Sequence, residues 1–346
     1  MNTKATNAFG TKNFAFATFF LTGLTGLATF LIVATLGVIL LNVLINGWSG
    51  LSLRFIMGGT EKDMFDVNHA GVLPMIIGTA ARVIIMTIFV IPVGVITAVY
   101  LTEYAHPTSM VTRVTRGAVN NLAGVPSIVF GLFGLGFFIN FLGQNLDDRV
   151  VPVEDQAITS FSVYWTLLKA ALTGRAPFFV LPHQTALPLW GRPAILWASL
   201  TLAVMTLPVV IIATEESLRA IPQGMREASL ALGATKLETI IRIVLPQALP
   251  GILTGGILAV SRAAGEVAPI LFTGAAYFMA DLPRSLHDQF MDLGYHVFIL
   301  STQSPNIDKT KPILYATVVV LLFLTFALNI VAILIRARMR KKLRAL

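Results

Sequence analysis

The sequence predicts an all-α, polytopic membrane protein with about six transmembrane helices. Of its 346 residues, 55% are hydrophobic and only 12% are charged, whereas an ordinary soluble domain is about 25% charged. The mean hydropathy is +0.79. The apolar residues are gathered into separate runs, each close to the ~20 residues that one bilayer crossing requires. These observations make the number of spans, rather than the number of globular domains, the first question.

The apolar runs define a transmembrane domain over 20–335, between an N-terminal tail at 1–19 and a basic tail at 336–346. The first run carries no charge from Asn13 to Leu53 and is longer than the ~7–15-residue apolar core of a cleavable signal peptide. Shorter stretches at 156–168, 176–191 and 293–307 are expected to be loop, re-entrant or interfacial segments. The spans are expected near 20–46, 78–102, 118–142, 194–214, 247–275 and 312–335.

The distribution of Lys and Arg sets the expected orientation. Cytoplasmic segments of membrane proteins are enriched in these residues, and the highest density here lies in the tail at 336–346. We therefore expect a multi-pass membrane protein with both termini in the cytoplasm. The segment at 143–192 then lies outside, and that at 215–245 lies inside.

Several classes of function are excluded or disfavoured. The chain has no cysteine, which excludes disulfides, thiol catalysis and thiolate metal sites. There is no G-x-x-x-x-G-K-[ST] run for binding nucleotide phosphates, and the five histidines show no metal-ligand spacing. We therefore predict no catalytic residues, no metal site and no cofactor in this chain. The net charge of +8 is ascribed to the membrane orientation rather than to nucleic-acid binding.

Proline lies inside four of the expected spans, at Pro92, Pro126, Pro208 and Pro269. Each proline removes a backbone donor and bends its helix. Kinked bundles suit transporters and channels, although prolines are also common in ordinary membrane helices. The acidic residues of the outer segment are interpreted as a solvated face; they are Asp147, Asp148, Glu154 and Asp155.

The segment 215–245 breaks the membrane pattern and is the most informative stretch. A helix is expected from Gln223 to Leu232, where Gly233 stops it. Thr235 and Glu238 form a T-x-x-E capping box that begins a second helix. Pro246 is expected to mark the bend into the membrane. A short amphipathic helix of this kind either docks into a groove of a partner or lies on the lipid surface.

The same segment contains the spacing E-A-x(4)-G-x(9)-I-x-L-P and resembles the EAA loop of bacterial ABC-importer permeases. Ser229 stands where the family pattern usually has a second Ala. The resemblance implies that the first helix couples to an ATPase subunit, with Glu227 and Gly233 at the matching positions. The residues that carry it are Glu227, Ala228, Gly233, Ile243, Leu245 and Pro246.

Three further stretches resemble the PstA-type permease subunits of phosphate ABC importers. They are AGVPSIVFGL at 123–132, SRAAGEVAPILFT at 261–273, and TEE at 214–216 followed by Ile221-Pro222. Val267 stands where the family usually has Thr. The resemblance covers 70–142 and 193–335, implies the type I importer permease (MetI-like) fold, and leaves 143–192 as an insertion.

The resemblance also implies the partners of this chain. These are a second permease of similar fold, a dimer of ATPase subunits that binds ATP and Mg, a periplasmic phosphate-binding protein, and the lipid of the bacterial inner membrane. Contact with this binding protein is the alternative interpretation of the acidic residues in the outer segment. This chain is then a transport subunit and not an enzyme. The alternatives are a permease for another oxyanion, such as sulfate or molybdate, a secondary transporter, or a membrane enzyme.

Arg262 and Glu266 are the candidates for an anion pathway. They are four residues apart and share one helix face, and charged groups within a span usually face a bundle interior or a water-filled cavity. Either Arg262 lines the route and Glu266 holds it in place, or the pair only fixes packing. Arg82 is a weaker candidate, with snorkelling to the headgroups as its alternative. Small residues at i+4 spacing should let another helix approach closely; they are Gly251, Gly255, Ala259 and Ala263.

Overall fold

The computed structural model describes residues 11–59, 65–66, 70–106, 108–150, 188–279 and 281–344. Within these ranges the chain is helical, and its only extended pairing is an isolated bridge between Ala275 and Phe290. Six helices are long and apolar enough to cross a membrane, which confirms the expected fold class. They are Thr18–Trp48, Leu73–Tyr104, Ser127–Asp147, Ile195–Arg219, Lys236–Gly265 and Ile307–Lys341.

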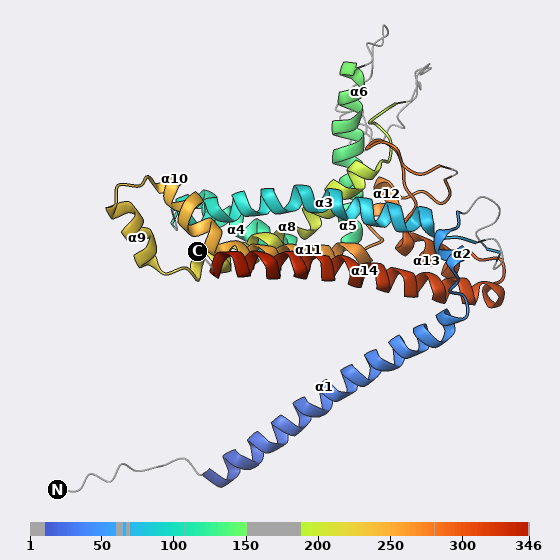
Figure 1. Ribbon diagram of the computed structural model, residues 1–346, viewed down its shortest axis with the longest axis horizontal. Helices are drawn as coiled ribbons and strands as arrows, with labels where there is room; N and C mark the ends of the chain where they lie inside the picture. Colours follow the sequence, from blue (N-terminus) through green and yellow to red (C-terminus); the bar gives the residue numbers. More distant parts are fainter. Residues whose placement is uncertain are drawn as a thin grey trace, which may run out of the picture.

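The helices follow one another in the order shown in Figure 1, with η denoting a π-helical segment. They are α1 (Thr11–Trp48), α2 (Leu53–Met57), α3 (Leu73–Val99), η1 (Tyr100–Tyr104), α4 (Met110–Leu122), α5 (Ser127–Phe133), η2 (Gly134–Gly143), α6 (Gln144–Val150), α8 (Ile195–Arg219), α9 (Gln223–Ala231), α10 (Lys236–Thr239), η3 (Ile240–Val244), α11 (Leu245–Gly265), α12 (Ile270–Thr273), α13 (Leu293–Thr302) and α14 (Ile307–Arg344).

The fifth span differs most from the range expected at 247–275. The helical backbone runs from Lys236 without a break, because Pro246 lies in the first turn of α11, where a missing backbone donor costs least. Pro246 therefore does not mark a bend into the membrane. At the other end α11 stops at Gly265, since Glu266 has an extended backbone (φ −81°, ψ 130°), and only the short α12 follows.

Helices α3, α8, α11 and α14 lie side by side as a bundle (Figure 1). The expected small-residue stripe faces α8. A Cβ added at Gly255 would come within 2.8 Å of the Ala213 Cβ, and one at Gly251 would collide with Ser217. Ala259 and Ala263 are fully buried. The prediction that this stripe permits close helix approach is confirmed.

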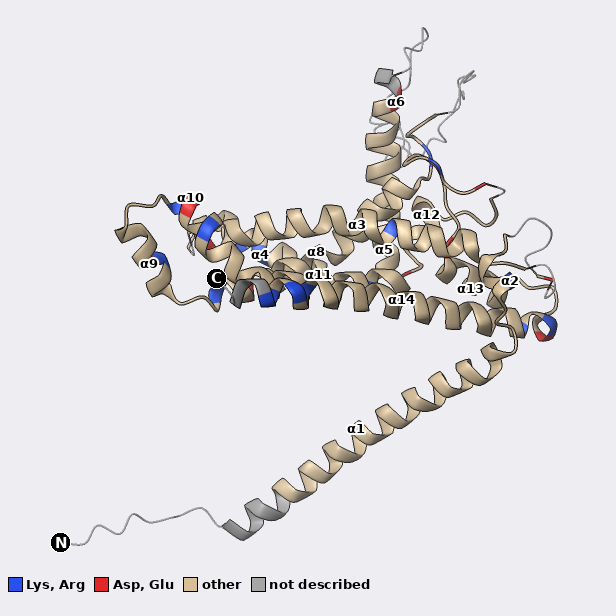
Figure 2. Cartoon of the chain, in the orientation of Figure 1, with Lys and Arg blue, Asp and Glu red and all other residues tan. Residues whose placement is uncertain are grey.

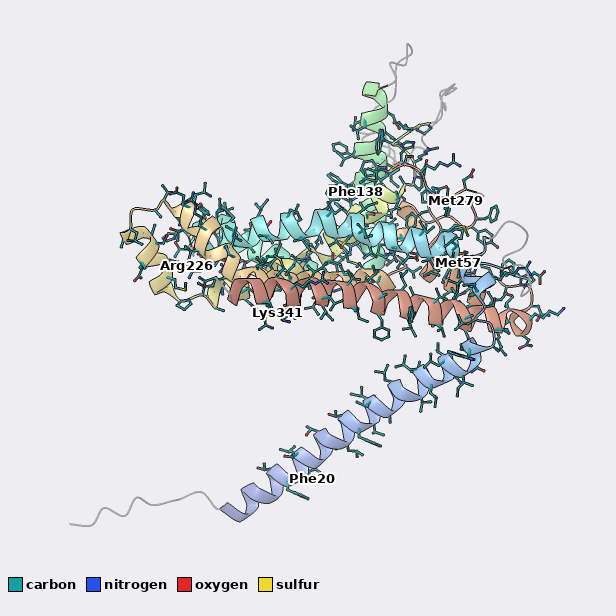
Figure 3. The ribbon with its side chains drawn as sticks, in the orientation of Figure 1. Phe20, Met57, Phe138, Arg226, Met279 and Lys341 are labelled. Atoms are coloured by element: carbon teal, nitrogen blue, oxygen red, sulfur yellow. The ribbon has the colours of Figure 1, made fainter. Side chains whose placement is uncertain are left out.

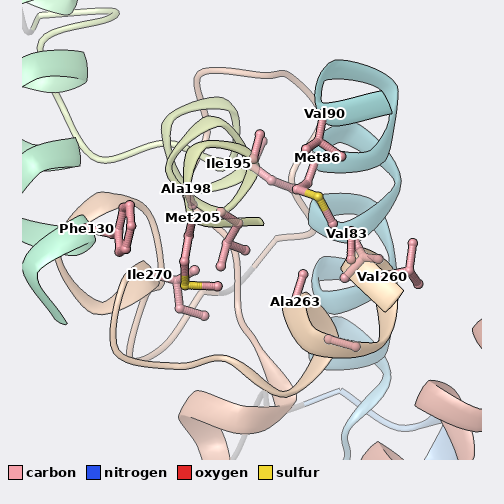
Figure 4. Close-up of a cluster of buried hydrophobic side chains, with 14 of the residues drawn as sticks. Val83, Met86, Val90, Phe130, Ile195, Ala198, Met205, Val260, Ala263 and Ile270 are labelled. Carbon is pink, nitrogen blue, oxygen red and sulfur yellow. The ribbon is translucent and has the colours of Figure 1, made fainter. Parts of the chain in front are cut away.

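The main apolar core fills the space between α3, α8 and α11 (Figure 4). Val83 and Met86 from α3, Met205 from α8, and Val260 and Ala263 from α11 contribute to it. The bundle thus holds α3, α8 and α11 together by ordinary close packing, and a displacement of one of these helices is opposed by its contacts with the others.

Helix α1 leaves the bundle (Figure 1). It contacts α14 only near its end, where Gly47 and Gly50 lie against the backbone of Tyr315 and Pro312. Along most of the rest of α1 the described side chains are exposed, as is that of Phe20 (61%; Figure 3).

The two ends of the bundle differ. Helices α9 and α10 and the C-terminal part of α14 lie together at one end, which we term the loop end, and α2, α13 and the start of α14 lie at the opposite end (Figure 1). Most Lys, Arg, Asp and Glu residues lie toward the two ends, while α1 and the middle of the bundle are largely uncharged (Figure 2). This is the pattern expected of helices that cross an apolar layer.

Candidate functional site

Helix α9 stands out from the loop end of the bundle and has no buried residue. Glu227 and Ala228, the first two residues of the EAA-like spacing, are both exposed. Leu232 directly after the helix is 90% exposed. Most of the surface of α9 is therefore available for contact with another molecule at the loop end of the bundle.

Gly233 ends α9 in the way its position in the sequence suggested. Its φ is +87°, and it is the one described residue with positive φ. The Gly233 N–H donates to the Leu230 carbonyl (3.0 Å), and the Ala234 N–H donates to the Ser229 carbonyl (3.2 Å). This paired arrangement is a Schellman motif, in which glycine is favoured because it has no Cβ.

The predicted capping box at Thr235 and Glu238 is also present. The Glu238 N–H donates to the Thr235 hydroxyl (3.3 Å), and the Thr235 N–H donates to the Glu238 carboxylate (2.9 Å). These two bonds satisfy backbone donors that the first turn of a helix otherwise leaves free. The capping box, which is a local sequence feature, thus sets the start of the second helix of the loop, α10, directly after Thr235.

The last residues of the EAA-like spacing lie where the loop joins the bundle. Ile243, Leu245 and Pro246 are half-buried, and Leu245 packs against the apolar cluster that contains the buried Val244 and Leu218. This part of the spacing joins the loop to the bundle, whereas its first part is exposed.

Arg226 fastens α9 to the bundle and was not identified from the sequence. Its Nη2 donates to the Glu103 carboxylate in η1 at 2.8 Å. Its Nη1 donates to the Ile221 carbonyl (2.7 Å), and Nη2 also donates to the Leu218 carbonyl (2.8 Å). Arg226 and Glu103 are 123 residues apart, so no local pattern could have linked them.

Arg262 and Glu266 form the predicted pair, with 3.6 Å between Arg262 Nε and Glu266 Oε1. Their side chains are 40% and 23% exposed. Ser261, next to Arg262, donates to the Asn329 side chain of α14 at 2.7 Å. Within this chain the pair lies at the surface of the bundle where α11 ends, and the Arg262 guanidinium is accessible.

The expectation that Arg82 snorkels to the headgroups is wrong. Arg82 is fully buried, and its Nε lies 2.6 Å from a carboxylate oxygen of Asp292, which is also fully buried. Its Nη1 donates to the Ala263 carbonyl (2.8 Å), and Nη2 donates to the Ala264 carbonyl (3.2 Å). The guanidinium thus binds the C-terminal end of α11, where carbonyls lack helical partners and a cation is favourable.

Asp292 completes this network from the other side. One of its oxygens accepts from the Thr79 hydroxyl (2.8 Å), and the other accepts from the N–H groups of Gly294 (2.9 Å) and Tyr295 (3.1 Å). Asp292 is therefore the N-cap of α13. The Arg82 network joins α3, α11 and α13, and its occupied donors leave Arg82 no free edge for an anion.

Two other residues, Asp147 and His296, also differ from expectation. The Asp147 carboxylate accepts from the N–H groups of Trp190 (2.8 Å) and Gly191 (2.6 Å). It therefore links α6 to the segment that precedes α8 and is not part of a solvated face. His296 lies in the stretch 293–307, which was expected to be a loop, re-entrant or interfacial segment, but it is buried in α13, where burial lowers its pKa to about 4.

Some predictions fall on residues that the structure does not describe. They are 151–187 of the outer segment, with Glu154 and Asp155, the first ten residues of the N-terminal tail, the last two of the basic tail, and the side chain of Asp148. Among the described residues there is no group of three or more His, Asp or Glu residues placed to hold a metal ion.

The fold and these sites define a polytopic helical membrane protein with an exposed helix–glycine–helix loop at one end of its bundle. Residues 90–345 match the model of a protein family described as the inner membrane component of binding-protein-dependent transport systems. The match covers more than half of the chain, and the chain belongs to this family. It is a permease subunit of an ABC importer and a multi-pass inner membrane protein, that is, a transport subunit.

Individual relatives agree with the family. The chain is 32% identical over 252 residues to the probable ABC transporter permease protein YqgI of Bacillus subtilis, covering 73% of this chain and 68% of that protein. It is 34% identical over 226 residues to the phosphate transport system permease protein PstA 1 of Mycobacterium tuberculosis, covering 65% and 56%. The match thus spans little more than half the length of the latter.

A further relative is the phosphate transport system permease protein PstA of Mycobacterium leprae, 33% identical over 262 residues, with 73% of this chain and 68% of that protein covered. Among solved structures, the chain is similar to one of the MetNI methionine ABC transporter in an inward facing conformation. That similarity has a TM-score of 0.45 and 17% identity, covering 78% of this chain and 94% of the other.

Proposed function

We propose that this chain is the permease subunit of an ATP-driven importer that moves inorganic phosphate across the inner membrane. Two of the relatives above are phosphate transport system permeases, and the stretches 123–132 and 261–273 resemble that group. The observation that carries the proposal is Arg262, an accessible guanidinium within the fifth apolar span.

Arg262 has the chemistry that phosphate recognition requires. A guanidinium presents a planar fork of donors that matches two phosphate oxygens and stays charged at every physiological pH. Glu266, at 3.6 Å, orients the guanidinium without touching the ion, because two anions would repel one another. Arg82 takes no part in binding the ion in this proposal, because its donors are already used within the chain.

The remaining assignments follow from the same proposal. The periplasmic phosphate-binding protein delivers phosphate to the outer face, and a second permease of similar fold lies against this chain. A dimer of ATPase subunits, which binds ATP and Mg, contacts α9 within the cytoplasmic loop at 215–245. Both termini lie in the cytoplasm. ATP binding moves the loop, the bundle reorients, and hydrolysis resets it.

A pair of neutralising variants tests the role of Arg262. We expect Arg262→Gln to lose phosphate uptake while the protein remains in the membrane with its ATPase, and Arg262→Gln/Glu266→Gln to remain inactive. Arg284→Gln is the control, because Arg284 forms a local pair of similar length with Asp281 (3.5 Å) outside the candidate spans, and it should import normally. A double variant that imports phosphate at the wild-type rate would remove Arg262 from the pathway.

Uptake of sulfate and molybdate by the same membranes tests the alternative of another oxyanion. We expect phosphate to be imported and neither of the others to compete at equal concentration. Import of sulfate or molybdate without phosphate would leave the permease assignment intact but would refute phosphate as the substrate.

Glu227→Lys tests the coupling assignment of α9. Glu227 is exposed on a helix with no buried residue, so the variant should insert normally yet lose uptake and retain less ATPase subunit on pulldown. Asp281→Lys reverses an equally exposed charge in the segment between α12 and α13 and serves as the control. Wild-type uptake by Glu227→Lys would refute the assignment.

A further inference from the structure

Apolar packing does not fix the position of α9. None of its residues is buried, and its large apolar side chains Met225 and Leu230 are 38% and 48% exposed. Besides Arg226, its side chains make one bond to the rest of the loop, between the hydroxyls of Ser229 and Thr239 (2.9 Å). A force on α9 therefore reaches the bundle through the backbone at its two ends and through polar contacts, and not through apolar packing.

Arg226 supplies most of these contacts. It is 18% exposed, and its partner Glu103 is 10% exposed. Its Nε and Nη2 both donate to one Glu103 oxygen, at 3.2 and 2.8 Å, while Nη1 and Nη2 reach the carbonyls of Ile221 and Leu218. Hydrogen bonds between ionised groups are the strong ones in proteins.

The partners of Arg226 belong to the two helices that form the centre of the bundle. Glu103 lies in η1, the continuation of α3. Leu218 lies in the last turn of α8, and Ile221 lies two residues after the end of that helix. Carbonyls at a helix end lack helical partners and favour a cation. One side chain on α9 is thus bonded to both α3 and α8, whose inner residues share the main apolar core.

We infer that Arg226 is the positioning residue through which displacement of α9 moves α3 and α8. This inference rests on the proposed function, in which α9 contacts the ATPase. Glu227 is exposed and available to the ATPase subunit, while the neighbouring Arg226 is hydrogen-bonded to Glu103 and Leu218 of the bundle. If α9 moves, it either carries the ends of α3 and α8 with it or breaks the bonds of the guanidinium. Lysine cannot replace this role, because a single ammonium lacks the fork that reaches the carboxylate and both carbonyls together.

The test uses the complete transporter reconstituted in liposomes with its binding protein, with ATP hydrolysis and phosphate uptake measured on the same sample. We expect Arg226→Gln, Arg226→Lys and Glu103→Gln to retain the ATPase subunit and to hydrolyse ATP, while phosphate imported per ATP falls about tenfold or more. Arg219→Gln is the control, because Arg219 also forms a 2.8 Å salt bridge at the end of α8, to Glu215, but makes no bond to α9. It should keep the wild-type ratio.

A rescue experiment separates transmission from folding. The chain has no cysteine, so Glu103→Cys/Arg226→Cys introduces the only two thiols of this subunit. Before cross-linking this variant should hydrolyse ATP with little uptake, and joining the thiols with a short bismaleimide should restore uptake per ATP. Failure of the cross-link to restore it, or loss of ATPase binding in step with uptake, would show that Arg226 only stabilises the loop.

The outcomes distinguish this inference from the proposed function. If the wild-type complex retains no ATPase or imports no phosphate, the proposed function is wrong. If the wild-type complex imports phosphate and the Arg226 variants keep its ratio of phosphate to ATP, the function stands and the inference about Arg226 is overturned.

Discussion

The Arg82 network and the loop end of the bundle use the same chemistry under different exposure. Arg82 and Asp292 are both fully buried, with 2.6 Å between their charged atoms. Arg226 and Glu103 keep 18% and 10% of their side-chain surface, at 2.8 Å, and lie beside an exposed helix. Each arginine binds one carboxylate and the carbonyls at the end of a neighbouring helix. The residue types are the same in the two places, and the difference lies in burial. The fully buried pair holds helices together inside the bundle, whereas the partly exposed pair lies where a partner protein can reach the neighbouring helix.

The energetic reason lies in desolvation. A buried charge that loses its partner has no water to replace it, whereas a partly exposed one does. Changes to the Arg82 network should therefore alter the stability of the whole chain, and changes at the loop end should alter local order and coupling. The predictions below test this difference, beginning with the largest expected effect.

Asp292→Ala should cause the largest loss. It leaves the Arg82 guanidinium buried without its counter-charge and removes the N-cap of α13, and breaking a buried pair costs about 3–5 kcal/mol. We expect a lower melting temperature in detergent and lower abundance in the membrane. Asp281→Ala, at a carboxylate that is 78% exposed, is the control. Equal abundance of the two variants would show that the buried pair does not stabilise the chain more than an exposed carboxylate does.

Gly233→Val should have an intermediate effect confined to the loop. A Cβ at Gly233 would meet nothing within 4 Å, so the cost arises from the positive φ alone, about 1–2 kcal/mol. Hydrogen exchange should quicken at 223–245, uptake should fall, and abundance should stay near normal. Gly224→Ala, where the added Cβ also meets nothing but φ is not positive, should leave uptake unchanged. If both variants behave alike, the conformation of Gly233 is not what matters.

Thr235→Ala should act on a smaller part of the loop. It removes the hydroxyl that accepts from Glu238 N–H, and losing an N-cap costs about 1 kcal/mol. Amide exchange should increase in the first turn of α10. Thr97→Ala, where the hydroxyl only bonds the carbonyl of Val93 one turn earlier, should show no such change. Unaltered exchange at 236–239 would mean that packing, and not the capping box, holds this turn.

Arg262→Gln and Glu266→Gln should have the smallest effect on stability. The pair is 3.6 Å apart and partly exposed, and pairs of this kind contribute about 0–1 kcal/mol. Each single variant should therefore reach nearly wild-type abundance by immunoblotting, even where uptake is lost. An abundance as low as that of Asp292→Ala would show that the Arg262–Glu266 pair is also needed for the stability of the chain.

The sequence by itself determined the features that depend on neighbouring residues. The six candidate spans follow from apolar runs that contain few or no charges, because the cost of burying charge in lipid acts on each segment separately. The positive φ of Gly233, the capping box at Thr235 and the pairing of Arg262 with Glu266 each involve residues no more than four positions apart. A single turn or a helix end fixes such geometry before any tertiary contact forms.

Only the tertiary structure decided which distant residues meet. Arg82 and Asp292 are 210 residues apart and Arg226 and Glu103 are 123 apart, and nothing in the spacing of either pair marks it. The same holds for the end of α11 at Gly265, where the carbonyls of the last turn are bound by an arginine from α3. The free energy of a buried charge depends on its surroundings in three dimensions, and those surroundings are set by how α3, α8, α11 and α13 pack.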